Sequence, residues 1–359
     1  MEAHPKVIIR CLVYNHEPYL RDCLEGFVMQ QTNFPFKAVV HDDASTDNSA
    51  AIIREYAEKY PHIIEPIYET ENQYSKHDGS LGRIMNAATL GRSPYLAYCE
   101  GDDYWIDPLK LQKQVDYMDA HPECSMTCTN AEILTPEGVL EDATLQKRGW
   151  IRPQKTGILK TEDIINKGGE NIYIHTCTMV VRPSVIPELR RTIKNCTVGD
   201  YPLQIMATLR GRVYYFHEKT ACYRYGHPES WTGKFLNNSN NVNWITKEKN
   251  SILHMLADMN KYSGGMYNAA FVSTQIRTVT QYLSKHPKYR KEILKNIGWV
   301  LRYTYLSKHI QIHHRNFISW LIFTLKRILI WPYYPIDNAL KLLLPKWHPA
   351  VLIGKLLNK

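Results

Sequence analysis

Short apolar runs alternate with amphipathic stretches along the first part of the chain. Residues 7–13, 36–40 and 96–99 are apolar runs of strand length with almost no charge. Each is followed by a polar turn and then by apolar residues at helical spacing, which is typical of an α/β domain with parallel strands. We therefore predict three strands, with helices that end near residues 31, 60, 90 and 119.

Later in the chain the pattern becomes less regular. Residues 63–91 show no clear period before their helical end, and residues 135–165 are polar and contain no motif. Four later segments still have the length and composition of strands. They lie at residues 125–130, 175–181, 213–216 and 220–225.

A change of pattern near residue 244 indicates a second region. Residues 243–261, 267–284 and 289–307 carry spaced apolar positions and little strand signal, so each is predicted to be a helix. We expect an α/β domain over residues 1–235 and a helical C-terminal region over residues 236–359.

Three carboxylates lie where one of the predicted strands ends. Glu100, Asp102 and Asp103 follow residues 96–99 directly, with Gly101 making the turn. In open α/β sheets, ligands bind at the carboxyl ends of the strands. Clustered carboxylates there suit a hard divalent cation that carries a diphosphate. The alternative is that the two aspartates only form a turn and cap the next helix.

Three segments in this order resemble the family 2 glycosyltransferases, which are inverting enzymes with the GT-A fold. They are residues 7–15, ending in Tyr-Asn, residues 39–47, containing Asp-Asp-Ala-Ser-Thr-Asp, and the acidic turn. The resemblance covers about residues 5–230 and is closest to enzymes of bacterial polysaccharide synthesis. It implies an α/β fold with a mixed central sheet, and transfer of a sugar from a nucleoside diphosphate sugar, expected to be a UDP-sugar, to an acceptor hydroxyl.

The resemblance also implies roles on the nucleotide side. Leu12, Val13 and Tyr14 would lie against the donor nucleotide, although Tyr14 could equally pack in the core. Asp43 would accept a hydrogen bond from the imide N–H of uracil. Arg83 would touch the base or a phosphate, with a solvated side chain as the alternative.

The remaining family roles concern metal, ribose and base. Asp102 or Asp103 would hold Mn²⁺ or Mg²⁺, and Glu100 or its neighbour Asp102 would position the ribose. Asp200, just before a predicted helix, matches the acidic residue that acts as catalytic base in the family. The alternative is a simple N-cap on that helix.

The segment from Arg224 to Thr232 resembles the mobile lid of the family. His227 would then complete the metal site and Arg224 would contact the diphosphate, although a lone loop histidine is often only solvated. In the polar middle region, Trp150 could stack on an acceptor sugar or simply pack against the protein.

Charge is concentrated at one end of the chain. The whole chain carries +9, whereas residues 285–359 hold 14 Lys or Arg against Glu292 and Asp337. Residues 316–336 are apolar and aromatic, but Lys326 and Arg327 interrupt them, which disfavours a spanning helix. We expect this region to lie on an anionic membrane surface, with a docked core helix or a dimer contact as the alternative.

The eight cysteines show no metal-ligand spacing and are expected to be reduced. No signal peptide is visible, so the predicted location is cytoplasmic, peripheral at the inner face of the cell membrane. The predicted acceptor is a glycan or lipid-linked glycan of the cell surface.

Other functions fit the sequence less well. A nucleotidyltransferase should show a glycine-rich basic loop after the first strand, where this chain has Val-Tyr-Asn-His-Glu. A dinucleotide-dependent oxidoreductase is disfavoured because G-x-G-x-x-G is absent. A basic nucleic-acid-binding protein remains an alternative, but aromatics mixed with aliphatics in the basic region favour lipid, so we expect no nucleic-acid partner.

Overall fold

The computed structural model describes residues 4–147, 150, 152–168, 173–193, 196–227, 230–238 and 241–285. The predicted helix at 289–307 and the predicted membrane-surface segment at 316–336 lie outside these residues. The chain divides into two compact units. The first contains residues up to 191 together with residues 200–237, and the second contains residues 192–199 and the chain from residue 238.

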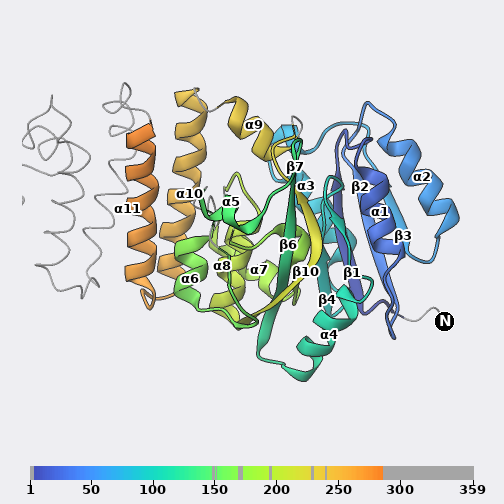
Figure 1. Cartoon of the computed structure of the whole chain (residues 1–359), viewed down its shortest axis with the longest axis horizontal. Helices are drawn as coiled ribbons and strands as arrows, with labels where there is room; N and C mark the ends of the chain where they lie inside the picture. Colours follow the sequence, from blue (N-terminus) through green and yellow to red (C-terminus); the bar gives the residue numbers. More distant parts are fainter. Residues whose placement is uncertain are drawn as a thin grey trace, which may run out of the picture. The chain divides into compact units, whose positions relative to one another are not determined.

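The first unit is built on a mixed sheet with strand order β3-β2-β1-β4-β9-β6-β10-β5 (Figure 1). Strands β1 to β4 pair in parallel, whereas β9 runs antiparallel to both β4 and β6. The strands are β1 (Val7–Val13), β2 (Phe36–Asp42), β3 (Ile64–Tyr68), β4 (Tyr95–Tyr98), β5 (Tyr104–Trp105), β6 (Cys124–Thr135), β7 (Gly138–Val139), β8 (Gly157–Ile158), β9 (Val180–Val181) and β10 (Arg212–Arg224).

Helices connect these strands, and their apolar faces pack on the sheet. The α-helices of the first unit are α1 (Leu20–Val28), α2 (Ser49–Lys59), α3 (Ser80–Thr89), α4 (Lys110–Ala120), α5 (Asp142–Lys147), α6 (Thr161–Lys167), α7 (Val185–Thr192), α8 (Asp200–Arg210) and α9 (Trp231–Asn237). Two 3₁₀ turns matter for the site, η1 (Tyr74–Lys76) and η3 (Thr176–Thr178). The α/β prediction with a mixed central sheet is confirmed.

Strand β3 was not expected, because Glu65 and Pro66 interrupt its apolar run. It lies at the edge of the sheet, where a residue without a backbone N–H is tolerated. The strand expected at 175–181 is also largely wrong. Thr178 folds back on His175, with its backbone N–H and its hydroxyl both donating to the His175 carbonyl oxygen, so only the last two residues form β9.

The two late strands predicted at 213–216 and 220–225 are one strand, β10. The exposed polar residues 217–219 suggested a break, but the structure absorbs them as register irregularities against β6. β10 thereby runs far enough to carry Arg224, its last residue, to the acidic turn that follows β4.

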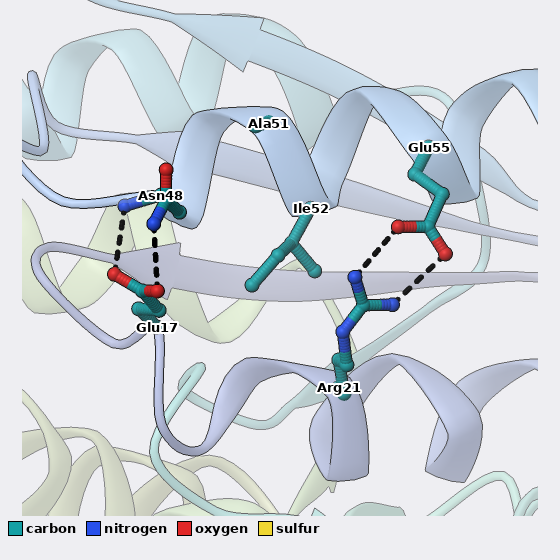
Figure 2. Close-up of a pocket in the computed structure, with 6 residues that line it drawn as sticks. All are labelled: Glu17, Arg21, Asn48, Ala51, Ile52 and Glu55. Atoms are coloured by element: carbon teal, nitrogen blue, oxygen red, sulfur yellow. Dashed lines mark hydrogen bonds and ion pairs between the residues drawn. The ribbon is translucent and has the colours of Figure 1, made fainter.

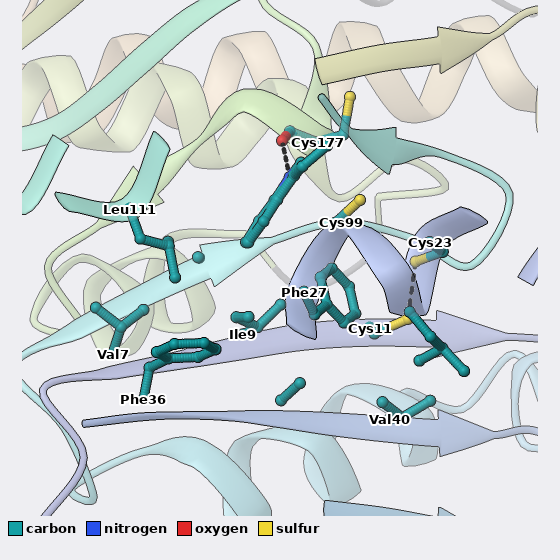
Figure 3. Close-up of a cluster of buried hydrophobic side chains, with 14 of the residues drawn as sticks. Val7, Ile9, Cys11, Cys23, Phe27, Phe36, Val40, Cys99, Leu111 and Cys177 are labelled. Carbon is teal, nitrogen blue, oxygen red and sulfur yellow. Dashed lines mark hydrogen bonds between the residues drawn. The ribbon is translucent and has the colours of Figure 1, made fainter. Parts of the chain in front are cut away.

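The core beneath this turn is closely packed (Figure 3). The aromatic ring of Phe27 lies edge-on to Trp105 with ring centroids 5.1 Å apart. A Cβ atom at Gly26 would stand 2.8 Å from the Trp105 backbone nitrogen, so only glycine lets α1 approach β5 this closely. The Sγ atoms of Cys11 and Cys23 are 3.9 Å apart without a disulfide. All eight cysteines are free, and all but Cys196 are buried.

The second unit contains helices α10 (Val242–Tyr262) and α11 (Asn268–Lys285), which pack against each other and were both predicted. The hydroxyls of Thr246 and Tyr282 are 2.7 Å apart, and the Gln275 side-chain amide donates to the Leu253 carbonyl oxygen. Within the described residues, none of the helices combines the length and hydropathy needed to cross a bilayer.

Candidate active site

The acidic turn between β4 and β5 is held against the end of β1. The Gly101 backbone N–H donates to the Leu12 carbonyl oxygen at 2.9 Å. A Cβ atom at position 101 would stand 2.8 Å from His16 Nδ1 and 2.9 Å from Val13 Cγ2. Glycine is therefore required here by close approach. Because β1, β2 and β4 are parallel, their carboxyl ends meet at one edge of the sheet.

Asp102 pairs with a histidine from the segment that follows β10. Its Oδ2 lies 2.8 Å from His227 Nε2, and both side chains are nearly buried. Burial raises its pKa, but the hydrogen bond with His227 and the charges of the His16 and His227 imidazoles outweigh that effect, so the pKa of Asp102 is lowered. The other oxygen, Oδ1, is buried and has no hydrogen-bond partner in the part of the chain that the structure describes.

Asp103 and Arg224 close the turn from the side of β10. The Arg224 backbone N–H donates to Asp103 Oδ1 at 2.9 Å, and its guanidinium donates to the Asp102 carbonyl oxygen at 2.8 Å. The same guanidinium pairs with Asp22 and lies over the rings of Tyr19 and Tyr104. Burial and the charge of Asp102 raise the pKa of Asp103 well above its usual range.

Glu100 and Asp200 lie within electrostatic reach of each other, although they are 100 residues apart in the sequence. Glu100 is exposed to solvent at the surface of the turn. Protein atoms around its carboxyl group desolvate it, and this effect, together with the charges of Asp102 and Asp200, raises its pKa. Asp200 is the first residue of α8 and accepts the Tyr201 backbone N–H at 2.7 Å. Its other oxygen accepts the Thr176 hydroxyl at 3.4 Å, and desolvation raises the pKa of Asp200.

His16 was not predicted as part of the site. It follows Asn15, whose φ of 56° is in the left-handed region, and its ring lies 6.3 Å from that of His227. Burial lowers the pKa of His16, while the nearby Asp102 raises it in part. Its sequence signal is its place in the polar turn directly after the first strand.

The predicted nucleotide side is assembled around the end of β1. The Asp43 backbone N–H donates to the Val13 carbonyl oxygen at 2.9 Å, so residues 12–14 and Asp43 are neighbours. The two carboxylate oxygens of Asp43 accept the backbone N–H groups of Gln73 and Tyr74 at 2.7 and 3.0 Å. Asp43 thus anchors the loop that leads into η1, and Tyr14 is only partly buried.

Arg83 and Trp150 have protein partners of their own. The Arg83 guanidinium donates to the Asp78 carbonyl oxygen at 2.7 Å and lies 3.4 Å from the Asp78 carboxylate, on the exposed side of α3. The Trp150 ring packs edge-on to Tyr225 with centroids 4.6 Å apart. The structure therefore ties Arg83 to its own loop.

The residues present are suited to a divalent cation that is shared with a substrate. Among the described residues, no group of three or more His, Cys, Asp or Glu side chains is arranged to hold a metal ion. Asp102 nevertheless keeps one buried carboxylate oxygen unpartnered. Mg²⁺ in particular is commonly held by one or two carboxylates, with substrate phosphates and water completing its coordination.

A separate pocket of about 410 Å³ lies between α1 and α2 (Figure 2). Its polar groups satisfy each other, since Arg21 pairs with both oxygens of Glu55, and Glu17 pairs with the backbone and side chain of Asn48. Exposed ion pairs of this kind contribute little to stability. Because the polar groups of this pocket are already paired with each other, the acidic turn is the better candidate for the active site.

The model of glycosyl transferase family 2 matches residues 9–186. The chain is 30% identical over 296 residues to an uncharacterised protein of Mycobacterium tuberculosis, covering 82% of this chain and 80% of that one. It is 22% identical over 288 residues to the minor teichoic acid biosynthesis protein GgaB of Bacillus subtilis, covering 80% of this chain and 29% of that one.

Among solved structures, the chain resembles S. aureus TarS, residues 1–349, with a TM-score of 0.47, 14% identity, and coverage of 98% of this chain and 87% of that chain. The mixed α/β fold is of the GT-A class. The chain belongs to glycosyltransferase family 2, as the family match states directly.

Proposed function

We propose that this glycosyltransferase moves a sugar, with inversion, from a UDP-sugar to an acceptor hydroxyl during synthesis of a cell-surface polysaccharide. The observation that carries the proposal is that Glu100 and Asp102 follow the carboxyl end of β4 directly and lie close enough to Asp200 for its charge to raise the pKa of Glu100. The relative GgaB is a minor teichoic acid biosynthesis protein, which supports a surface polysaccharide as the product.

The donor side would use groups at the ends of β1 and β2. Asp43 accepts two backbone N–H groups, and a carboxylate has about four lone-pair sites. It can therefore also accept the imide N–H of uracil, which favours a UDP-sugar. Residues 12–14 would lie against the nucleotide, and Glu100 would receive a ribose hydroxyl.

Asp102, with Asp103 and His227 beside it, would hold Mn²⁺ or Mg²⁺. When bound, the cation neutralises negative charge on the departing diphosphate. The chain's own part is to fix the carboxylate: His227 holds Asp102 Oδ2, which leaves Oδ1 free. Arg224 adds a positive charge next to this turn, although Asp22 shares that charge.

Asp200 would act as the base. It takes the proton of the acceptor hydroxyl while that oxygen bonds to the anomeric carbon and the bond to the diphosphate breaks. Attack occurs on the face opposite the diphosphate, so one step inverts the anomeric configuration. The raised pKa of Asp200 makes it a better proton acceptor than an ordinary carboxylate.

The decisive experiment is a screen of nucleotide sugars for hydrolysis and for thermal protection, with Mn²⁺, with Mg²⁺ and with a chelator. We expect a UDP-sugar to be hydrolysed slowly and to raise the melting temperature only when a metal is present. A chain that hydrolyses none of the common nucleotide sugars, and is protected by none, would refute the proposed donor. Equal protection with and without chelator would refute the metal role.

A further inference from the structure

A second group of polar side chains is buried in the first unit, and we call it the Arg152 cluster. It has an asparagine on β6, a tyrosine on β10, an arginine in the loop before β8 and a histidine before η3. Its members are Asn130, Arg152, His175 and Tyr215. Within the described residues, four buried atoms have no hydrogen-bond partner: Arg152 Nη2, both ring nitrogens of His175, and Tyr215 Oη. Buried polar atoms are normally paired, so this group requires an explanation.

The charge of Arg152 is poorly compensated. Its Nη1 donates to Asn130 Oδ1 at 3.1 Å, which supplies no negative charge. The nearest carboxylate, Asp142, is 3.5 Å away, and its side chain is 70% exposed whereas that of Arg152 is only 10% exposed. Burial lowers the pKa of Arg152. A buried cation with only a surface partner is costly unless a second anion completes it.

The other two members can donate without adding charge. Burial and the nearby Arg152 lower the pKa of His175 to about 3, so its ring is neutral and has one N–H. Burial raises the pKa of Tyr215, so its hydroxyl keeps its proton. Arg152 lies close enough to both that its charge shifts their pKa values. The cluster therefore offers a guanidinium, an imidazole N–H and a hydroxyl whose buried, unpartnered atoms lie within electrostatic reach of Arg152.

The Arg152 cluster lies next to Asp200. His175 directly precedes Thr176, whose hydroxyl donates to Asp200. The His175 ring packs on Tyr223 with centroids 4.8 Å apart. Tyr223 is close enough to the acidic turn that the charges of Asp103 and Asp102 contribute to its raised pKa, after burial. A group bound at this cluster would be held on the side of the proposed base.

We propose that the Arg152 cluster binds an oxyanion, a carboxylate or a phosphate, carried by the acceptor. This inference rests on the proposed function, because it places the acceptor beside Asp200. Asp142 lies near Nη1 of Arg152, and the acceptor oxyanion would join it by binding the unpartnered Nη2. Arginine is well suited to bind carboxylate and phosphate, and the unpartnered Nη2 of Arg152 would be the charged donor, with His175 and Tyr215 as neutral donors.

The test is thermal protection of the full chain by three small probes. Methyl glucuronide carries a carboxylate, glycerol 3-phosphate carries a phosphate, and methyl glucoside is the neutral match of the first. We expect at least one anionic probe to half-saturate at a concentration roughly 10- to 100-fold lower than the glucoside, as a charge-assisted hydrogen bond implies. The better of the two anions identifies the source of the oxyanion.

Variants locate the binding. Arg152→Gln should weaken protection by the anion to the level of the glucoside, whereas Arg190→Gln, at an exposed arginine of α7, should leave it unchanged. Tyr215→Phe removes only the unpaired hydroxyl and should weaken the anion several-fold. This second variant decides the matter if Arg152→Gln fails to fold by circular dichroism.

Equal half-saturation by the glucuronide, the phosphate and the glucoside would overturn the proposal, and so would an equal loss in Arg152→Gln and Arg190→Gln. Failure of the proposed function looks different, because the donor screen would then give no turnover while anion protection still depended on Arg152. Once a donor is known, Arg152→Gln should raise KM for an anionic acceptor and leave KM for its neutral analogue unchanged.

Discussion

The acidic turn and the Arg152 cluster leave opposite kinds of atom without a partner. In the turn it is a carboxylate oxygen of Asp102, which can only accept. In the cluster it includes a guanidinium nitrogen of Arg152, which can only donate. Asp200 lies near both regions. Its charge raises the pKa of Glu100 in the acidic turn, and its carboxylate accepts the hydroxyl of Thr176, which follows His175 of the cluster.

The difference indicates that the two regions lack ligands of opposite charge. Unpaired acceptors in a negative cluster call for a cation, and unpaired donors around a buried cation call for an anion. Had either region existed only for stability, its polar atoms would be expected to pair within the protein, as they do in the pocket between α1 and α2. Substitutions in either region can test this comparison.

The largest effect is expected from Asp102→Asn. The amide keeps the shape and can still bond to His227, but it replaces the free carboxylate oxygen and removes the charge. Donor turnover should fall by about 1,000-fold or more, since a metal supplies several kcal/mol of transition-state stabilisation. Donor binding measured by calorimetry should also lose its dependence on Mn²⁺.

The matched control is Asp116→Asn, at an exposed position of α4 where the carboxylate accepts a hydrogen bond from the Gln112 side chain. It should leave turnover and metal dependence as they are. Full activity of Asp102→Asn with unchanged metal dependence would contradict the assignment and reduce the turn to a structural feature.

The next largest effect is expected from Asp200→Asn, at the point where the two regions meet. Asparagine can still cap α8 but cannot take a proton, so the transfer rate should fall roughly 100- to 10,000-fold with little change in donor affinity. Because desolvation raises the pKa of Asp200, the wild-type rate should fall as pH drops through a value above the ordinary aspartate range. That acid limb should disappear in Asp200→Asn, measured as kcat/KM against pH.

Near-normal transfer by Asp200→Asn would assign this residue to capping. Its hydrogen bond to the Tyr201 backbone N–H shows that it can cap α8. An unchanged acid limb would direct the search for the base elsewhere, to His227 for example.

The acidic turn could be predicted from sequence because its causes are local. A buried strand excludes charge, so the abrupt change from residues 96–99 to Glu100 and Asp102 indicates where the strand leaves the core. Parallel strands then bring this end next to Asp43. The prediction that Gly101 makes a turn was correct in position, but the structure requires glycine because His16 and Val13 lie so close.

The rest of the site depends on contacts between distant segments. His227 meets Asp102 only because β10 continues through its polar residues 217–219 instead of breaking there. The Arg152 cluster brings together four segments that have no common motif, and a missing hydrogen bond leaves no trace in composition. No local pattern could have indicated that Arg152 and His175 would be buried together.

A smaller effect is expected at Asp43, the carboxylate whose two oxygens are both satisfied by the protein. Asp43→Asn leaves one of the Gln73 and Tyr74 backbone N–H groups facing an amide N–H. Urea unfolding should show a loss of about 1–3 kcal/mol in the free energy of unfolding. UDP affinity, measured by calorimetry, should fall as well if Asp43 also accepts uracil.

Asp42→Asn is the matched control, because Asp42 Oδ1 is buried without a partner among the described residues and its pKa is raised by burial. Removing that carboxylate should cost less stability than removing Asp43. An equal or larger loss in the free energy of unfolding for Asp42→Asn would contradict the interpretation that unpaired carboxylate oxygens at this edge are available for a ligand.

The smallest effect on catalysis is expected from the basic C-terminal region, whose 14 Lys or Arg residues form a third charged part of the chain. We propose that it brings the enzyme to an anionic membrane surface carrying a lipid-linked acceptor. Lys326→Glu with Arg327→Glu should weaken binding to anionic vesicles by roughly tenfold or more, since each cation near such a surface contributes about 1 kcal/mol. Donor hydrolysis in solution should not change. Co-sedimentation with anionic and neutral vesicles, at low and high salt, measures this directly. Equal recovery with both vesicle types, or none with either, would mean that this region packs against protein, and the acceptor would then have to reach Asp200 and the Arg152 cluster without a membrane holding the enzyme in place.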